Sequence, residues 1–416
     1  MTEYPAVPLR RAARILNGGT PPSGDLSLWG GDVPFVTPPD LNGLDGRLLH
    51  TTARAITEEG VAHSGVAPRG SVLLSTRAPV GHIGRPSSRV AFNQGCRALV
   101  PNGGFDARYL AYTLVAARSE LDARALGTTF LELSGSSLAS VDVPRPSLTA
   151  QRAIADYLDR ETAQIDAFIA KNEELIALIA ERRSAVVDLE VTGGRRILER
   201  PRPSRWFGQV PGDWRLLPVK GVSRRVTDGA HISPETEGGV FDFVSTRDVG
   251  DGQIDFEGSL KTSPGSYDYM VRTGCRPYKG DVLYSKDGTI GATAVVREDR
   301  EFVVASSLVI ISPSRATVHP EYLRYALSAR PTLEQARTLV RGAGLPRLSV
   351  ANLGRVVIPV PPLEEQVEIV AQLDSVVGSS TDAFETARRA IELARERRAA
   401  LISAAVTGKI DVGVAA

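Results

Sequence analysis

The segment from Pro144 to Gly193 begins PRPSLTAQRAIADYLD, and the segment from Pro359 to Gly408 begins PVPPLEEQVEIVAQLD. Both segments end in Val-Thr-Gly, and their shared residues lie 215 positions apart without a gap. A constant separation over that many positions indicates an internal duplication. The matched residues are Pro144 with Pro359, Pro146 with Pro361, Leu148 with Leu363, Gln151 with Gln366, Leu158–Asp159 with Leu373–Asp374, and Arg182–Arg183 with Arg397–Arg398.

Each copy has the pattern of one long helix. Proline precedes it, which suits a helix start, and Gly193 or Gly408 follows it, as C-terminal glycines do. Apolar residues recur at alternating steps of three and four, the heptad pattern of a coiled coil. About 45 residues give a helix roughly 65 Å long. The predicted contact rows are Ile165, Phe168, Asn172, Leu175, Ile179, Arg182, Val186 and Leu189, and Phe384, Ala387, Ile391, Ala394, Arg398, Leu401 and Ala405.

A contact row of this length needs a partner helix. The nearest candidate is the other copy, so we predict that the two helices pair within one chain. Asn172 supports the pairing, because a polar residue in the row can fix register and partner. The alternative is two ordinary amphipathic helices, each on a separate core.

The composition is ordinary for a globular chain of two or three domains, with 416 residues, 23% charged and 6% aromatic. No apolar run approaches the roughly 18–20 residues of a membrane span. The N-terminus lacks the apolar core of a signal peptide, so we expect a cytoplasmic protein without membrane contact. Cys96 and Cys275 lie in different halves and suggest neither a disulfide framework nor a zinc site.

The net charge of +1 implies no particular partner, but one segment is strongly basic. Between Arg195 and Arg225 there are nine basic residues and two acidic ones. Such a segment can bind a nucleic acid backbone, or it can be a solvated linker. The sequence leaves both interpretations open.

The segments outside the helices repeat one framework with different loops. FVTPPDL at 35–41 matches FVSTRDV at 243–249, and GSVLLSTRAPVG at 70–81 matches GDVLYSKDGTIG at 280–291. YLAYTL at 109–114 matches YLRYAL at 322–327. A strand is expected at Val72–Ser75 and a helix at about 107–121, so each segment is predicted to be a small α+β unit.

No pattern indicates catalysis. The chain has no GxxxxGK[ST] loop, HExxH, GxSxG or dinucleotide fingerprint, and its five histidines stand alone. TPPDL at 37–41 shares Pro-Pro with an acidic-Pro-Pro-aromatic methyltransferase motif but lacks the aromatic residue. We therefore predict no catalytic residue, no metal site and no cofactor in this chain.

The loops carry side chains suited to binding DNA. Asn and Gln can bond both edge groups of adenine, Arg can bond guanine through two acceptors, and Ser or Thr commonly bond phosphate. The alternative is that Ser, Thr and Asn only cap turns. The predicted DNA-contacting residues are Thr76, Arg77, Asn93, Gln94, Thr128, Thr129, Thr246, Arg247, Lys286, Arg341 and Arg347.

In their order along the chain, these segments resemble the specificity subunit of type I restriction–modification enzymes. GGTPPSGDLSLWGGDVPFVTPPDL resembles the start of that family's target recognition domain, and LLSTRAPVGHIG followed by NQGCRALVP resembles its middle. The PxPxLxxQ pattern and the Val-Thr-Gly helix end, each present twice, carry most of the resemblance, which covers essentially the whole chain. The second copy lacks the Gly-Gly-Thr-Pro opening and the Pro-Pro pair.

The resemblance implies a fold and a division of the chain. Two α+β target recognition domains are joined by two long helices in an antiparallel intramolecular coiled coil with pseudo-two-fold symmetry. The expected segments are a first recognition domain at 1–147, a first spacer helix at 148–193, a basic linker at 194–213, a second recognition domain at 214–362, a second spacer helix at 363–410, and a tail at 411–416.

The resemblance also implies a function. Each globular unit reads one half of a two-part site in double-stranded DNA, and the helices set the distance between the halves. Two methyltransferase subunits dock on the helices, and restriction subunits join them. S-adenosylmethionine, ATP and Mg²⁺ belong to those partners. The sequence leaves open whether a restriction subunit takes part.

Two other functions compete with this interpretation. One is a nuclease or methyltransferase with an unrecognised site, against which the missing cofactor motifs argue. The other is a coiled-coil scaffold that recruits proteins without reading DNA, against which the basic segment and the matched polar loops argue.

Because the two units differ between their shared motifs, we expect an asymmetric DNA target.

Insertion of four residues into both helices, near Asn172 and Ala387, is expected to lengthen the unread spacer of the DNA site. Both half-sites should stay the same, because the loops that read them are not changed. Mapping of the methylated sequence measures both quantities, and an unchanged spacer would contradict the role of the helices as a ruler.

Overall fold

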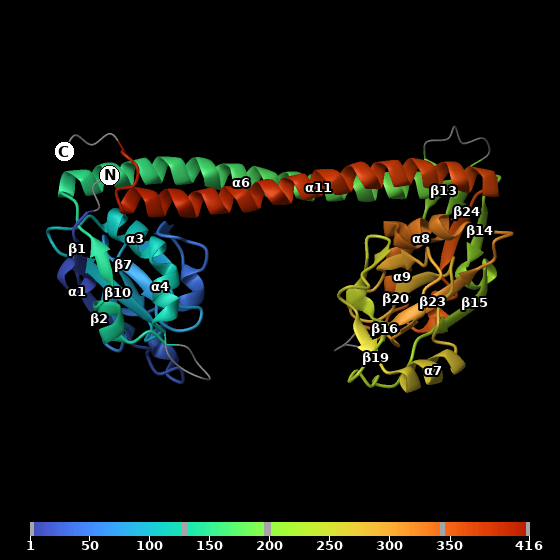
Figure 1. Cartoon of the computed structure of the whole chain (residues 1–416), viewed down its shortest axis with the longest axis horizontal. Coiled ribbons are helices and arrows are strands. Elements are labelled where there is room, and N and C mark those ends of the chain that lie inside the picture. Colours follow the sequence, from blue (N-terminus) through green and yellow to red (C-terminus); the bar gives the residue numbers. More distant parts are fainter. Residues whose placement is uncertain (1–3, 126–131, 195–200, 342–345, 413–416) are drawn as a thin grey trace. The chain divides into compact units, whose positions relative to one another are not determined.

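The computed structural model describes residues 4–125, 132–194, 201–341 and 346–412, which form two compact units (Figure 1). Unit 1 comprises Met1–Glu173 with Arg388–Ala416, and unit 2 comprises Glu174–Ala387. Each unit thus contains one end of both long helices together with one globular segment. The predicted six-segment division of the chain stays a prediction.

The two long helices are α6, Leu148–Val191, and α11, Leu363–Val406, of 44 residues each. Ser147 caps the start of α6, since its hydroxyl accepts a hydrogen bond from the backbone N–H of Ala150 at 3.2 Å. Gly193 and Gly408 follow the helices with φ of 73° and 76°. Only glycine adopts this left-handed conformation freely, so both predicted helix ends are confirmed.

The helices pair antiparallel within each unit. In unit 1, Arg398 lies 3.0 Å from Asp166 and Arg395 lies 3.2 Å from Glu173, so residue numbers fall along α11 as they rise along α6. In unit 2, Val191 of α6 shares one hydrophobic core with Leu373 of α11. The predicted pairing within one chain is confirmed in both units.

The contact row of α11 agrees with the prediction, but that of α6 is shifted at every second position. Phe168, Leu175 and Leu189 are 49%, 47% and 39% exposed, and Arg182 is also exposed. The residues one position later face inward instead: Ile169, Ile176 and Arg183 are partly buried, and Glu190 is buried.

The shift has a physical cause in the core of unit 1. Leu158 is fully buried in that core, and the inward row continues from it by steps of four and three through Thr162, Ile165 and Ile169. Apolar residues occur in α6 at positions of both the predicted row and the shifted row, so their spacing alone cannot show which row faces inward. Packing against the globular segment determines which row is buried.

Unit 1 contains two main sheets and a strand pair. One sheet has the order β2-β10-β7-β8-β4, the other has the order β5-β3-β9-β6, and β1 pairs with β11. The strands are β1 Ala6–Pro8, β2 Ala13–Asn17, β3 Trp29–Val36, β4 Leu48–Leu49, β5 Arg54–Ile56, β6 Gly65–Ala67, β7 Val72–Ser75, β8 Ile83–Pro86, β9 Val90–Phe92, β10 Cys96–Pro101 and β11 Asp142–Pro144.

The short helices of unit 1 cover these sheets and connect them to the long pair. They are α1 Leu9–Ala12, α2 Glu58–Val61, α3 Ala107–Ala116, α4 Arg118–Ala123 and α5 Gly135–Ala139, with the 3₁₀ turns η1 Leu26–Leu28 and η2 Pro38–Leu41. The strand predicted at Val72–Ser75 and the helical segment predicted at about 107–121 are both present, the latter as α3 and α4.

Unit 2 repeats this topology with shorter sheets. The order β15-β23-β20-β21 matches β2-β10-β7-β8, and β19-β16-β22 matches β5-β3-β9. Its strands are β12 Arg202–Ser204, β13 Gly208–Val210, β14 Arg215–Pro218, β15 Ser223–Asp228, β16 Phe241–Val244, β17 Val249–Gly250, β18 Gln253–Ile254, β19 Leu260–Thr262, β20 Val282–Ser285, β21 Thr293–Val295, β22 Phe302–Val304, β23 Leu308–Pro313 and β24 Val357–Val360.

The helices of unit 2 outside the long pair are α7 Pro264–Arg272, α8 Pro320–Ser328, α9 Arg330–Thr338 and α10 Val350–Leu353, with the 3₁₀ turns η3 Val219–Gly221 and η4 Thr246–Asp248. The pairs β3–β9 and β16–β22 are parallel, while β3–β5 and β16–β19 are antiparallel. The α+β class and the internal repeat are therefore confirmed.

A buried glutamine attaches each globular segment to its long helix. Gln151 of α6 donates to Gly104 O and Pro146 O, both at 3.0 Å, and accepts from the backbone N–H of Asp106 at 2.9 Å. Gln366 of α11 repeats the pattern with Thr317 O, Pro361 O and the N–H of His319. Both glutamines are fully buried, which accounts for the Gln of the duplicated PxPxLxxQ pattern.

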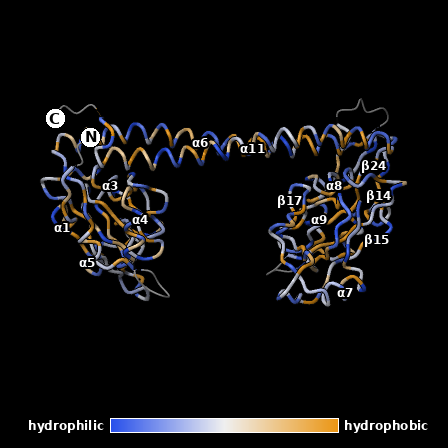
Figure 2. The backbone as a smooth tube through the Cα atoms, viewed as in Figure 1, coloured by the Kyte–Doolittle hydropathy of each residue, from blue (hydrophilic) through white to orange (hydrophobic). Residues whose placement is uncertain are grey.

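Tyrosines extend this attachment from the globular side. Tyr112 donates to Asp159 of α6 at 2.7 Å, and Tyr325 donates to Asp374 of α11 at 2.6 Å. Burial is the main cause that raises the pKa of each hydroxyl to about 12, so both stay protonated donors at neutral pH. Apolar residues collect in the interior of each unit, whereas polar and apolar residues alternate along the long helices (Figure 2).

None of the helices in the described part of the chain combines the length and the apolar character that crossing a bilayer requires. Within the same ranges, no group of three His, Cys, Asp or Glu residues could hold a metal ion.

Ile165→Ala is expected to destabilise the chain by about 2 kcal/mol or more, because Ile165 is 9% exposed and its truncation leaves a cavity. Phe168→Ala is the matched control and should cost well under about 1 kcal/mol, because Phe168 is half-exposed. Thermal unfolding of the two full-length variants tests the corrected contact row. A larger loss for Phe168→Ala would show that the row has the originally predicted phase.

Candidate nucleic-acid interface

A buried serine shapes the matched loop of each unit. At the end of β7, Ser75 Oγ donates to Pro79 O at 2.6 Å and accepts from the N–H of His82 at 2.8 Å. At the end of β20, Ser285 Oγ donates to Thr289 O and accepts from the N–H of Ala292 at 2.8 Å. Each hydroxyl closes its own loop, and the middle of each loop is exposed, at Arg77–Pro79 in unit 1 and at Gly288–Thr289 in unit 2.

A second segment runs beside each of these loops. The N–H of Leu133 donates to Thr76 O at 2.8 Å, and the N–H of Leu348 donates to Lys286 O at 3.0 Å. Arg77 is thereby paired with Glu132, and Asp287 with Arg347, in single antiparallel bridges. Two segments that are distant in sequence thus form one surface in each unit.

Each of these two bridges carries an ion pair between an arginine and a carboxylate, but the two residues lie on opposite segments in the two units. In unit 1 the first loop supplies the cation, and Arg77 lies 3.3 Å from Glu132. In unit 2 the first loop supplies the anion, and Arg347 lies 3.8 Å from Asp287. The frameworks are alike, but the position of positive charge on them is reversed.

A tight turn completes the surface in each unit. The N–H of Thr76 donates to Gly95 O at 2.8 Å, and the N–H of Lys286 donates to Ser307 O at 2.9 Å. Asn93 is partly buried and its side-chain oxygen accepts from the N–H of Gly95, whereas Gln94 is exposed and accepts from the hydroxyl of Thr20. By backbone bonding, Asn93 corresponds to Ala305, so the amides of unit 1 have no counterpart at this turn of unit 2.

In unit 2, three predicted residues meet around one cavity of about 500 Å³, lined by Lys286, Arg341 and Arg347 together with Asp228. The amine of Lys286 lies 3.2 Å from Asp287 and 3.9 Å from Asp228. Since Lys286 is 8% exposed, its charge is held by these two carboxylates. Arg341 and Arg347 are exposed and face solvent at the rim.

Thr76 requires a correction. It is fully buried, and its hydroxyl donates to Gly95 O at 3.3 Å. Its side chain supports the loop and is not accessible to DNA, so Thr76 is left out of the interface. Sequence position alone suggested exposure, because Thr76 lies between a strand and a Pro-containing loop.

The remaining predicted residues are more scattered. Thr246 and Arg247 lie in η4, partly buried and exposed respectively, and do not line the cavity of unit 2. Thr128 and Thr129 lie outside the described residues, as do Arg195, Arg196 and Arg200 of the basic segment. DNA contact stays a prediction for all the other residues of the predicted set: Arg77, Asn93, Gln94, Thr128, Thr129, Thr246, Arg247, Lys286, Arg341 and Arg347.

The structure adds residues that the predicted DNA-contacting set did not contain: Thr20, Glu132, Asp228, His231 and Asp287. His231 Nε2 lies 2.9 Å from Asp228 Oδ2 beside the cavity of unit 2. A signal existed for Asp287, which occupies the place of Arg77 in the matched loop. No sequence signal pointed to the pairing of Glu132 with Arg77 or of Asp228 with Lys286, because each pair joins residues more than 50 positions apart in the chain.

Comparison with known proteins agrees with this arrangement. The family model described as type I restriction modification DNA specificity domain matches residues 11–177 and 218–393. These two matches cover most of the chain and correspond to its two repeats.

The chain belongs to the family of type I restriction–modification specificity subunits. It is 25% identical to the type I restriction enzyme MjaIX specificity subunit of Methanocaldococcus jannaschii, over 97% of this chain and 93% of that protein. It is 24% identical to the type I restriction enzyme EcoBI specificity subunit of Escherichia coli, over 76% of this chain and 68% of that protein.

The fold is also found in a solved structure from the work “Structural basis underlying complex assembly and conformational transition of the type I R-M system”. The TM-score is 0.69 at 18% identity, with 99% of each chain covered. Membership of this family assigns the chain to DNA sequence recognition, and the matching family model is not a catalytic one.

Proposed function

We propose that this chain is a non-catalytic subunit that reads a bipartite, asymmetric DNA site and docks two methyltransferase subunits. The reversed ion pair carries the proposal. One framework presents Arg77 beside Glu132 in unit 1 and Arg347 beside Asp287 in unit 2. Arginine prefers guanine, and carboxylates accept from cytosine, so moving the charge changes the preferred base at that place.

Three differences between the units support an asymmetric target. The ion pairs are reversed, the amides of Asn93 and Gln94 occur only in unit 1, and the cavity lined by Lys286 and Arg341 belongs to unit 2. The backbone contacts that hold these groups are the same in both units. Two units of this kind place different side chains against the two half-sites, whereas identical units would read a palindrome.

The exposed apolar residues of α6 support the docking of partner proteins. Phe168, Leu175, Leu178 and Leu189 are 39% to 55% exposed and recur at spacings that keep them on one side of a helix. An apolar row of this kind is unfavourable in water and typical of an interface. We assign it to the modification subunits.

The proposal places the chemistry on those partners. S-adenosylmethionine would bind to the methyltransferase subunits, and ATP and Mg²⁺ to restriction subunits where these join. The complex would act in the cytoplasm, where host DNA is methylated. A coiled-coil scaffold that recruits proteins without DNA is the second candidate, favoured only by the exposed apolar row.

Arg347→Gln is expected to weaken DNA binding and relax base preference in one half-site, by about 1–3 kcal/mol if Arg347 contacts guanine. If Arg347 contacts phosphate instead, the loss should be uniform across sequences, and the slope of log affinity against log salt should fall by about 1. Fluorescence anisotropy over a salt series distinguishes these two contacts.

Arg389→Gln is the matched control for this experiment. Arg389 is on α11, also pairs with a carboxylate, and its side chain is 66% exposed, as is that of Arg347. The control variant should bind DNA like the parent chain. Equal binding by both variants would remove Arg347 from the DNA interface.

The function as a whole is tested by methylome sequencing of cells that express this chain with its methyltransferase partner. Cells that express the partner alone are the control. We expect a new methylated motif with two different half-sites and an unread gap. If the partner is expressed and active but no new motif appears, the scaffold function is favoured.

A further inference from the structure

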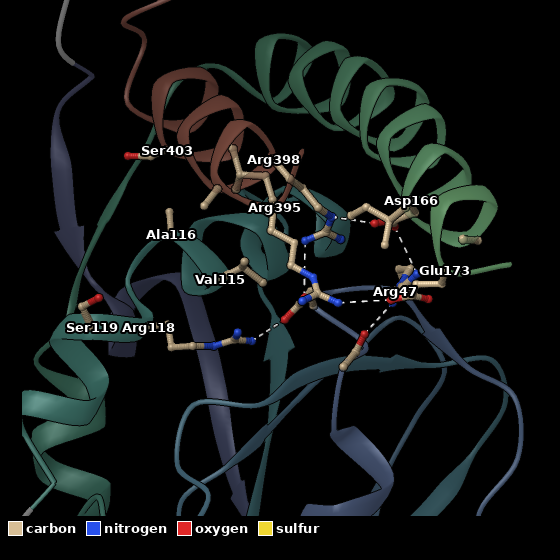
Figure 3. A pocket seen from close by; sticks show the side chains of 16 residues that line it. Arg47, Val115, Ala116, Arg118, Ser119, Asp166, Glu173, Arg395, Arg398 and Ser403 are labelled. Carbon is tan, nitrogen blue, oxygen red and sulfur yellow. Dashed lines mark hydrogen bonds and ion pairs between the residues drawn. The ribbon is translucent and has the colours of Figure 1, made fainter. Parts of the chain in front are cut away.

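Unit 1 contains a cavity of about 690 Å³ that the DNA-reading proposal does not use. Its walls come from the loop that follows η2, from the junction of α3 and α4, and from both long helices (Figure 3). Val115, Ile169 and Ala399 supply apolar surface. Volumes of about 300–1,000 Å³ are typical of small-molecule sites.

Ion pairs surround this cavity. Arg118 lies 2.5 Å from Asp45, Arg47 lies 3.0 Å from Asp166, and Arg395 lies 3.2 Å from Glu173. Figure 3 shows the side chains of Arg47, Arg118 and Arg395 directed toward the same space. Each of the three carboxylates therefore already has an arginine of its own.

Arg398 is the fourth arginine and lies deepest, with 7% of the residue exposed. Its Nε is 3.0 Å from Asp166 Oδ1, and its Nη1 is 3.4 Å from Asp45 Oδ2. Its Nη2 has no hydrogen-bond partner among the described residues. A buried N–H of a charged group without an acceptor is unfavourable, and an anion in the cavity would satisfy it.

The charges favour an anion as well. Burial acts to raise the pKa of Asp45, but the hydrogen bond and charge of Arg118, with the charges of Arg398 and Arg47, lower it on balance. Asp45 is therefore a carboxylate at neutral pH, and the guanidinium groups are always charged. Four arginines face three carboxylates, which leaves an excess of one positive charge.

In unit 2, the globular segment is attached to the long helices without a cluster of ion pairs like the one around the cavity of unit 1. There, Arg183 of α6 lies 3.0 Å from Asp251, and this pair matches Arg398 with Asp45. Asp45 and Asp251 occupy equivalent left-handed Asp-Gly turns, with φ of 46° and 50°. Three of the cavity's other charges have no counterpart in unit 2, where Thr381, Ala180 and Pro331 replace Asp166, Arg395 and Arg118.

We propose that the cavity of unit 1 binds a small phosphate-bearing ligand. Arg398 Nη2 donates to a phosphate oxygen from the bottom of the cavity, and Arg395 donates from the rim, where it is 63% exposed. The organic part of the ligand packs against Val115, Ile169 and Ala399, because the cavity is larger than a free phosphate ion.

The bound ligand would connect elements that one ion-pair cluster now holds together. It would touch the loop that carries Asp45 and Arg47 and also both long helices of unit 1. Binding would therefore stiffen the attachment of this globular segment to its helix pair. This site is independent of the DNA-reading surface.

Titration calorimetry on the full-length chain tests the proposal, with inorganic phosphate and adenosine monophosphate as separate probes. We expect at least one probe to bind with 1:1 stoichiometry. Tighter binding of adenosine monophosphate would support an organic phosphate as the ligand class, whereas binding of phosphate alone would contradict the packing of an organic part in the cavity. Absence of binding by both probes at millimolar concentration would overturn the proposal.

Two variants and a matched control locate the binding. Arg398→Met should abolish it, and Arg395→Gln should weaken it about tenfold while removing only an exposed ion pair with Glu173. Arg183→Met removes the equivalent attachment of unit 2 and should leave affinity unchanged. If Arg398→Met does not fold, Arg395→Gln still tests whether the ligand binds in this cavity. Unchanged affinity in Arg395→Gln would place the ligand elsewhere and contradict the proposal.

Discussion

The structure depends on the burial of Gln151 and Gln366 between each globular segment and its long helix. Each amide is fully buried and satisfies two carbonyl groups and one N–H at the start of a helix. A buried amide without these partners would be costly, so the helix, the preceding Pro-containing strand and the globular segment must meet in one arrangement. Apolar packing holds the same elements together, because residues of both long helices belong to the main core of each unit.

On this common base, the two units hold different chemistry in the same places. Ser75 and Ser285 close equivalent loops, and Leu133 and Leu348 pair with equivalent carbonyl groups. These contacts involve backbone atoms or buried hydroxyl groups, so they do not restrict the outward side chains. Arg77 and Asp287 can therefore differ in charge without any change in the fold. A recognition surface that varies on a constant framework is the expected consequence.

Apolar residues occur on both the buried and the exposed face of α6. The inward row packs against α11 and the globular segments, and the outward apolar residues remain in solvent. Near the first globular segment, the long helices also form a cavity with an excess of positive charge, which the second unit does not repeat. The two attachments are thus equivalent, whereas the surfaces around them differ.

The sequence by itself determined the duplication, the α+β class, the two long helices with their glycine ends and the strand at Val72–Ser75. These features depend on local preferences and on matched spacing, both of which are visible without coordinates. The row of α6 residues that faces inward could not be predicted, because apolar residues occur in two possible rows and only packing around Leu158 determines which one is buried. The burial of Thr76, the pairing of Arg77 with Glu132 and the cavity around Arg398 were likewise decided by tertiary structure. Each of them joins residues that are far apart in the chain, and sequence spacing carries no information about such contacts.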